Sequence, residues 1–167
     1  EGCEKLTKVT FGESLTSIGT SAFKSCTNLK SLNIPTSITA IENNTFEGCV
    51  NLNTTIPNSV TAIGDNAFKE CSKLTTELPN SVTSIGNNAF KECTNLTASL
   101  PANLTHVGDY GFFNCSGITG EIPESIVHIG HRAFENCIDI SINKPLINII
   151  DLFGRAFDGC PKIESVI

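Results

Sequence analysis

Cysteine is the residue type with the most chemical potential in this chain, and its copies recur at an almost constant interval. They stand at positions 3, 26, 49, 71, 93, 115, 137 and 160. So many cysteines in a short chain ordinarily suggest a disulfide framework, but stacked equivalent cysteines point the same way, whereas a bridge needs converging Cβ vectors. Zinc motifs need pairs at close spacing, which is absent here. The pattern favours a column of buried thiols that pack as small hydrophobic groups.

Three histidines form the other group that could do chemistry. His106 and His128 occupy equivalent positions 22 residues apart, so we expect them about 5 Å apart if equivalent residues stack. A metal could bridge such a pair, with His131 and Asp109 nearby, but no carboxylate or thiol completes a recognisable ligand set. Elsewhere the same position carries Ser17, Ala40, Ala62 and Ser84. Ordinary solvent-facing variation is therefore the favoured interpretation, and no metal, cofactor or catalytic residue is predicted, because a Gly-x-Ser-x-Gly elbow is also absent.

A repeat of 22 or 23 residues must position these side chains. Phenylalanines precede each later cysteine by three residues, at positions 23, 46, 68, 90, 112, 134 and 157. The consensus of one turn is Cys-x-x-Leu, a short polar stretch, Ile/Leu-Pro, x-Ser-Val, x-x-Ile-Gly, x-x-Ala-Phe, x-x-Cys. A fixed period of roughly 20–29 residues is typical of leucine-rich repeats. Because no single turn can bury its apolar side, the turns must stack around one core.

The turn that begins at Cys71 shows the expected path of the chain. Leu74 and Leu78 alternate with polar residues, which predicts a short strand and places the one regular sheet on their wall. Pro79 ends that strand because it lacks an amide hydrogen. Val82 and Ile85 line the opposite, less regular wall. Gly86 then supplies either a positive φ or a close backbone approach, and Ala89-Phe90 begins a tight corner of 3₁₀ or one-turn helical form.

The predicted fold is a leucine-rich-repeat solenoid, a right-handed parallel β-rich superhelix of about seven turns that the eight cysteines delimit. Residues 1–167 form one domain, roughly 35 Å long at the spacing of parallel strands. The segment 145–154 is one residue longer than its equivalents and carries Phe153 in the usual glycine place, which predicts a distorted turn. Neither end resembles a polar capping repeat. The start, Glu1-Gly2-Cys3, has neither Met nor a signal segment, so we expect a fragment of a longer array.

Composition excludes several classes of function. The net charge is −6, and only 17% of residues are charged, so the chain has no basic surface for nucleic acid or anionic membranes. No apolar run approaches the 18 or so residues that a membrane span needs. The surface must instead be built largely from Asn, Ser and Thr.

The segment 59–68, Ser-Val-Thr-Ala-Ile-Gly-Asp-Asn-Ala-Phe, resembles the BspA-like, or Treponema pallidum-type, leucine-rich repeats. The resemblance runs from Leu6 to the end of the chain. It implies a secreted or cell-surface protein of oral or gut bacteria or mucosal protists, adhesion to host proteins, other cells or extracellular matrix, and no catalysis. The resemblance identifies no binding residues.

The exposed side of the predicted sheet is the candidate binding surface. One column of side chains reads Asn33, Thr55, Glu77, Ser99, Glu121 and Asn143, and the next reads Lys30, Asn53, Thr75, Thr97, Thr119 and Ser141. Side chains alternate across a strand, so both columns should face outward. Short polar groups suit broad hydrogen-bonded contact with a protein or a glycan, although they lack aromatic anchors; avidity from many copies would then matter. A merely solvated face is an equally good interpretation.

Two functions follow from this surface. The first is a cell-surface or secreted adhesin, and the alternative is a structural spacer or an intracellular interaction scaffold; a hydrolase or transferase is not favoured. Asn-x-Ser/Thr sequons stand at Asn43, Asn53, Asn95, Asn103 and Asn114. They are candidate glycan sites in a secretory eukaryotic chain, or a product of composition alone, and Asn114 is a poor acceptor because it adjoins Cys115 in the tight corner.

Overall fold

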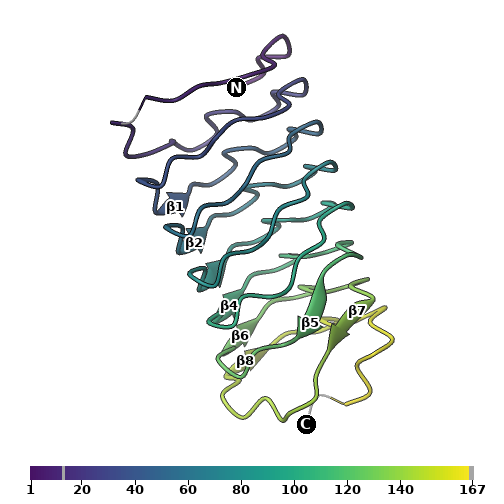
Figure 1. Ribbon diagram of the computed structural model, residues 1–167. Coiled ribbons are helices and arrows are strands. Elements are labelled where there is room, and N and C mark those ends of the chain that lie inside the picture. The colour runs from purple at the N-terminus through teal and green to yellow at the C-terminus, as the bar shows by residue number, and fades with distance from the viewer. Residues whose placement is uncertain (13, 166–167) are drawn as a thin grey trace.

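The computed structural model describes residues 1–12 and 14–165. Successive turns of the chain stack along one axis, with the two termini at opposite ends (Figure 1). One parallel sheet contains β1 (Ala40–Ile41), β2 (Ala62–Ile63), β3 (Ser84–Ile85), β4 (His106–Val107), β6 (His128–Ile129) and β8 (Asp151–Leu152), in that order. A second sheet pairs β5 (Thr119–Glu121) with β7 (Asp139–Ser141). Across the described ranges there is no helix long and apolar enough to cross a membrane.

The predicted parallel solenoid is confirmed, with fewer regular turns than the predicted seven. Strands of the main sheet come one per turn and begin only at Ala40. Most of the described side chains before Cys26 are exposed, and this segment contributes no strand to the sheet.

The position of the main sheet corrects the sequence prediction. The ladder lies on the wall of Ile63 and Ile85, which we call the ladder wall, and not on the wall of Leu74 and Leu78. On the described part of the predicted wall, the one pair of strands is β5 with β7, apart from isolated bridges. Buried threonine hydroxyls explain the difference: Thr54 Oγ1 donates to the Leu32 carbonyl at 2.8 Å, and Thr76 Oγ1 accepts from the Ile56 amide at 3.3 Å. Side chains therefore take the place of ladder bonds in the shorter central turns.

The corner after each ladder strand is a series of hydrogen-bonded turns, where the sequence predicted a 3₁₀ or one-turn helix. Within the corner the Lys69 amide donates to the Asn66 carbonyl at 3.2 Å, whereas the Phe68 amide donates to the Ala89 carbonyl of the next turn at 2.8 Å. Alternate amides thus point along the solenoid axis. Left-handed backbone at Asn66 (φ 54°) and Glu70 (φ 63°) makes this alternation possible. The same two positions have positive φ in the other corners.

A stack of phenylalanine rings fills the core, as the repeat predicted. Rings from Phe23 to Phe157 lie with consecutive centroids 5.2 to 5.7 Å apart and nearly parallel planes. Leu74, Val82 and Phe90 are fully buried, so their predicted inward orientation is confirmed. Each ring from Phe46 to Phe134 contacts its equivalents in both neighbouring turns, and the stacking therefore sets the register of the turns.

Gly86 illustrates why glycine ends the ladder strand. Its φ is not positive; instead a Cβ atom there would lie 2.7 Å from the Asp65 amide nitrogen. The next residue, Asn87, donates its amide to Asp65 Oδ1 at 2.7 Å. Of the two roles predicted for this glycine, the close backbone approach is correct. The same contact recurs in successive turns: the side chain at this position accepts from a backbone amide of the next turn, from Asn43 to Asp109, and Asp109 accepts from the His131 amide.

The cysteine column is buried from Cys26 onward, as predicted, but the thiols are also hydrogen-bond donors. Cys93 Sγ donates to the Phe68 carbonyl of the preceding turn at 2.9 Å, and that carbonyl also accepts from the Cys71 amide at 3.0 Å. Six thiols make this contact. Burial raises the pKa of these six thiols, to about 12 for Cys49 and about 11 for Cys160, because an apolar core destabilises the thiolate.

The long segment before β8 disturbs the solenoid less than predicted. Asp151 and Leu152 still pair with His128 and Ile129. The extra length is accommodated in the loop before the strand, where Ile147 and Ile150 are 81% and 80% exposed. The distortion is therefore confined to the loop, and the ladder continues through it.

Replacement of Phe90 by alanine should cost about 3–5 kcal/mol of folding free energy, because it removes a ring from the middle of the stack. Glu77→Ala should change stability by less than about 0.5 kcal/mol, since Glu77 is exposed. Chemical denaturation of both variants measures the difference. Equal destabilisation by the two substitutions would contradict the inward and outward orientations.

Candidate functional site

Eleven of the twelve residues in the two predicted columns are exposed, and Ser141 is half-buried. The exposed residues are Lys30, Asn33, Asn53, Thr55, Thr75, Glu77, Thr97, Ser99, Thr119, Glu121 and Asn143. We call this surface the polar wall. Between these residues, Leu74 and Leu78 point into the core, so polar and apolar side chains alternate along the chain. The alternation persists although most of the wall is not a sheet.

Two contacts on the polar wall join predicted residues from neighbouring turns. Asn53 Oδ1 accepts from both the amide and the hydroxyl of Thr75, each at 3.1 Å. Asn143 Nδ2 donates to Glu121 Oε1. These side chains are therefore held by one another, which reduces the entropy that a binding partner would have to remove.

The columns need one correction of register. Ser99 bridges Thr119, and Glu121 lies beside Ser141, two residues from the equivalence that the repeat implies. Thr119 accordingly lies beside Asp139. A slip of two residues leaves every side chain on its original face, whereas a slip of one would reverse it. The predicted outward orientation is therefore correct, although the predicted pairs of neighbouring residues are not.

A hollow of about 350 Å³ lies at the end of the polar wall, and we call it the Glu121 hollow. Its apolar lining is Leu100, Ala102, Ile122 and Pro123, and its charged rim is Glu121, Glu124 and Lys144. Lys144 Nζ lies 2.8 Å from Glu124 Oε1, which raises the pKa of Lys144. Glu121 forms no ion pair within the described ranges and so leaves the rim with one uncompensated negative charge.

The two equivalent histidines stack as predicted. The rings of His106 and His128 lie 5.9 Å apart between centroids, and the His128 ring also contacts Phe153 at 5.4 Å. The carboxylate beside the pair is Asp151, whose Oδ2 lies 3.3 Å from His128 Nδ1. Asp109 instead accepts the His131 amide. Over the described part of the chain no group of three or more His, Cys, Asp or Glu is arranged to hold a metal ion.

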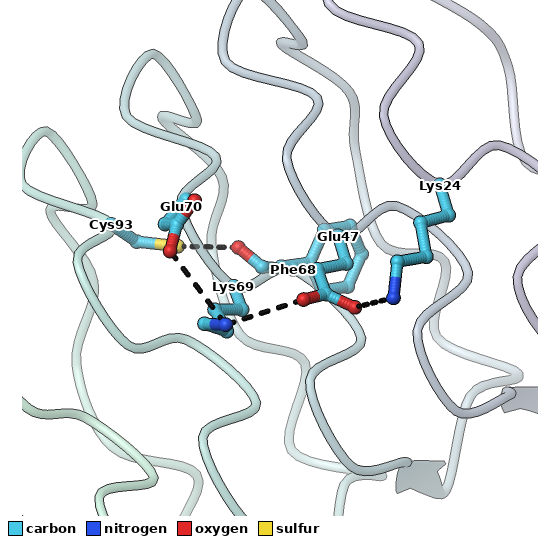
Figure 2. A network of polar contacts seen from close by, with 6 residues as sticks. All are labelled: Lys24, Glu47, Phe68, Lys69, Glu70 and Cys93. Carbon is cyan, nitrogen blue, oxygen red and sulfur yellow. Dashed lines mark hydrogen bonds and ion pairs between the residues drawn. The ribbon is translucent and has the colours of Figure 1, made fainter. Parts of the chain in front are cut away.

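A chain of ion pairs runs along the corners of the first turns. Glu47 lies between two lysines, 2.9 Å from Lys24 Nζ and 3.2 Å from Lys69 Nζ (Figure 2). Lys69 also approaches Glu70 at 3.7 Å. Burial opposes ionisation of Glu47, but the hydrogen bonds from both lysines outweigh it and lower the pKa of this carboxyl.

The same column of corners has different side chains from the fourth to the sixth corner. Lys91 Nζ lies over the rings of Tyr110 and Phe113, 5.1 and 5.4 Å from their centroids. Tyr110 makes edge contacts with Phe113 and His131, both at 5.6 Å, and Arg132 Cζ lies 6.0 Å from its centroid. We call these five residues the aromatic corner. Lys91 has no carboxylate partner in the ranges that the structure describes, whereas Arg132 Nε lies 3.4 Å from Glu135.

At two of the sequons the side-chain amide nitrogen itself donates a structural hydrogen bond. Asn114 Nδ2 donates to Glu92 Oε1 at 2.9 Å, and Asn103 Nδ2 donates to the Asn80 carbonyl at 3.0 Å. Asn114 also has a positive φ of 59° in the tight corner. Both amide nitrogens would have to leave these partners to receive a glycan.

Comparison with known proteins identifies the repeat. Residues 1–77 and 75–167 match the BspA type leucine rich repeat region family, with six copies of the repeat. The chain belongs to the BspA-type leucine-rich-repeat family. Among curated proteins no significant match exists.

Solved structures of bacterial proteins are similar to this BspA-type chain. A leucine rich cell surface protein from Faecalibacterium prausnitzii is 33% identical over 81% of the chain, with a TM-score of 0.71. The Treponema pallidum leucine rich repeat protein is 24% identical over 97% of the chain and 80% of its own length, with a TM-score of 0.74, and shows the fold alone. The chain spans only 38% of the length of the Faecalibacterium protein.

The aromatic corner is the feature of this BspA-type solenoid that sequence reasoning missed. Comparison of the turns with one another could have found it. Where Tyr110 stands, earlier turns have Asn44, Asn66 and Asn88. Where Phe113 stands, three earlier turns have Lys24, Lys69 and Lys91. Neighbouring positions whose residues both differ from those of the other turns indicate a surface that the stacking of turns does not require.

The Glu47 ion pairs predict an acid-dependent contribution to stability. Because the folded-state pKa of Glu47 is lowered, the contribution is present above the unfolded pKa of about 4.3 and is lost as pH falls through the folded value. Glu47→Gln should therefore lower the unfolding free energy by about 1 kcal/mol at pH 7 and by much less at low pH. Thermal melts across this range test it, with the more exposed Glu70→Gln as control. A difference that does not shrink in acid would contradict the ionic origin.

Proposed function

We propose that this solenoid is a cell-surface or secreted binding module that attaches to a protein or glycan partner through the polar wall. The observation that carries the proposal is the eleven exposed short side chains that continue over successive turns. Such a surface offers many hydrogen-bonding groups at regular spacing along a rigid stack. The similar protein from Faecalibacterium prausnitzii is described as a cell surface protein, which supports the location.

The chemistry of the wall favours recognition over catalysis. Its members supply hydroxyl, amide and carboxylate groups, and the carboxylates are those of Glu77 and Glu121 in the column that runs from Asn33 to Asn143. Contacts of this kind are individually weak and direct the orientation and specificity of a partner more than its affinity. An adhesin that acts in many copies on a surface compensates through avidity.

A binding panel tests the proposal. Purified extracellular-matrix proteins and a glycan array are probed with the immobilised wild-type chain, with Glu77→Lys and with Glu121→Lys. Glu42→Lys is the matched control, because Glu42 is also exposed but lies beside the ladder wall. We expect either wall substitution to weaken binding to a captured ligand at least about tenfold, which corresponds to 1.4 kcal/mol. Retained binding by both wall variants, with loss in the Glu42 variant, would place the site elsewhere.

A further inference from the structure

The aromatic corner has features that the scaffold does not explain. Tyr110 has a φ of 57°, a left-handed conformation that is unfavourable for a bulky residue and well tolerated by asparagine. The equivalent residues Asn44, Asn66 and Asn88 have φ values of 54° to 56°. The same position has a positive φ in every corner, including Arg132 and Arg155, so the left-handed backbone belongs to the scaffold and only the aromatic side chain is particular to this corner. The corner therefore carries an aromatic ring at a position where asparagine would be more favourable.

The composition of the corner is that of a protein-binding anchor. Tyrosine and arginine are enriched among residues that dominate protein interfaces. Here Tyr110 lies between the cations Lys91 and Arg132, and its ring is only partly buried. Its hydroxyl has no hydrogen-bond partner within residues 1–12 and 14–165. The polar wall lacks such an anchor, so this surface is distinct from the one proposed above.

The Glu121 hollow complements this corner in both chemistry and charge. Its lining is mixed: Leu100, Ala102, Ile122 and Pro123 are apolar, whereas Glu121, Glu124 and Lys144 give the rim a net charge of −1. The corner presents two aromatic rings with one uncompensated positive charge, that of Lys91. The volume of about 350 Å³ lies within the range of roughly 300–1,000 Å³ that is typical of ligand pockets.

The corner and the hollow also lie at the same level of the solenoid. Glu121–Glu124 is midway in sequence between Phe113 and Arg132, so the hollow lies half a turn from the corner around the axis. A group on one side cannot reach a hollow on the other side of the same rigid stack. A second copy placed alongside can reach it, with the two axes parallel.

We propose that the aromatic corner of one copy inserts into the Glu121 hollow of a second copy, so that solenoids associate side by side. The contact joins two different surfaces and is therefore heterologous. Such a contact leaves one corner and one hollow unoccupied in every dimer, which allows further copies to add. The association goes beyond the binding function of the polar wall. The hollow shares Glu121 with that wall, whereas Glu77 lies outside the hollow, so the Glu77→Lys variant tests ligand binding separately.

Substitutions that restore the residues of other turns provide a test with little risk to the fold. The corner variant Tyr110→Asn/Phe113→Lys introduces the residues of equivalent positions 88 and 91. The hollow variant Glu121→Ser/Glu124→Asn introduces those of positions 99 and 80. Glu42→Ser is the control. Circular dichroism melts verify that all variants fold, and sedimentation equilibrium up to about 1 mM covers weak association.

The wild type and Glu42→Ser should form dimers and larger species as concentration rises, and each double variant should remain monomeric. An equimolar mixture of the two double variants should form dimers that do not grow, because each partner retains one intact half of the contact. A wild type that is monomeric at every concentration would overturn the proposal. So would double variants that associate like the wild type, or a mixture that remains monomeric. Binding of ligands by the polar wall could persist in all of these cases.

Discussion

The carbonyl group of the corner phenylalanine is the point on which the stacking of turns depends. In the turn of Phe68 this oxygen accepts from the Cys71 amide of its own turn and from the Cys93 thiol of the next. A carbonyl oxygen has two lone pairs, and both are used. The spacing Phe-x-x-Cys follows from this geometry, because the same cysteine closes its own corner and bonds to the turn before it. Cysteine suits the position since it is a weak donor that is also small and hydrophobic.

Other features of the turn serve the same axial contact. Alternate corner amides donate to the next turn, serines such as Ser81 donate to a carbonyl of the preceding turn at 2.7 Å, and the phenylalanine rings stack at one ring per turn. Each turn closes its corners with its own backbone hydrogen bonds, and the bonds and ring contacts to its neighbours hold it in the stack, as expected of a solenoid. Because the scaffold uses inward and axial groups, outward side chains are free to vary, and both the polar wall and the aromatic corner exploit that freedom.

The sequence was sufficient for the period, the core and the exposed columns, because inward residues such as Leu74 and Phe90 recur at every turn. It was insufficient for the position of the main sheet. A periodic pattern does not specify whether the backbone near Thr54 and Thr76 pairs in a ladder or bonds to the threonine hydroxyls. That choice depends on three-dimensional contacts. The aromatic corner was missed for a different reason: attention to the consensus conceals the positions where single turns depart from it, as Tyr110 does.

The most direct test of the stacking is the reactivity of each cysteine toward iodoacetamide, followed by mass spectrometry of the native protein. Cys3 is exposed, whereas the thiols from Cys71 to Cys137 are buried donors with raised pKa values, and the thiolate is the reactive form. Near pH 8 we predict rapid modification of Cys3 alone, with modification of Cys93 only when denaturant unfolds the chain. Modification of Cys93 as fast as that of Cys3 under native conditions would contradict the stacked structure.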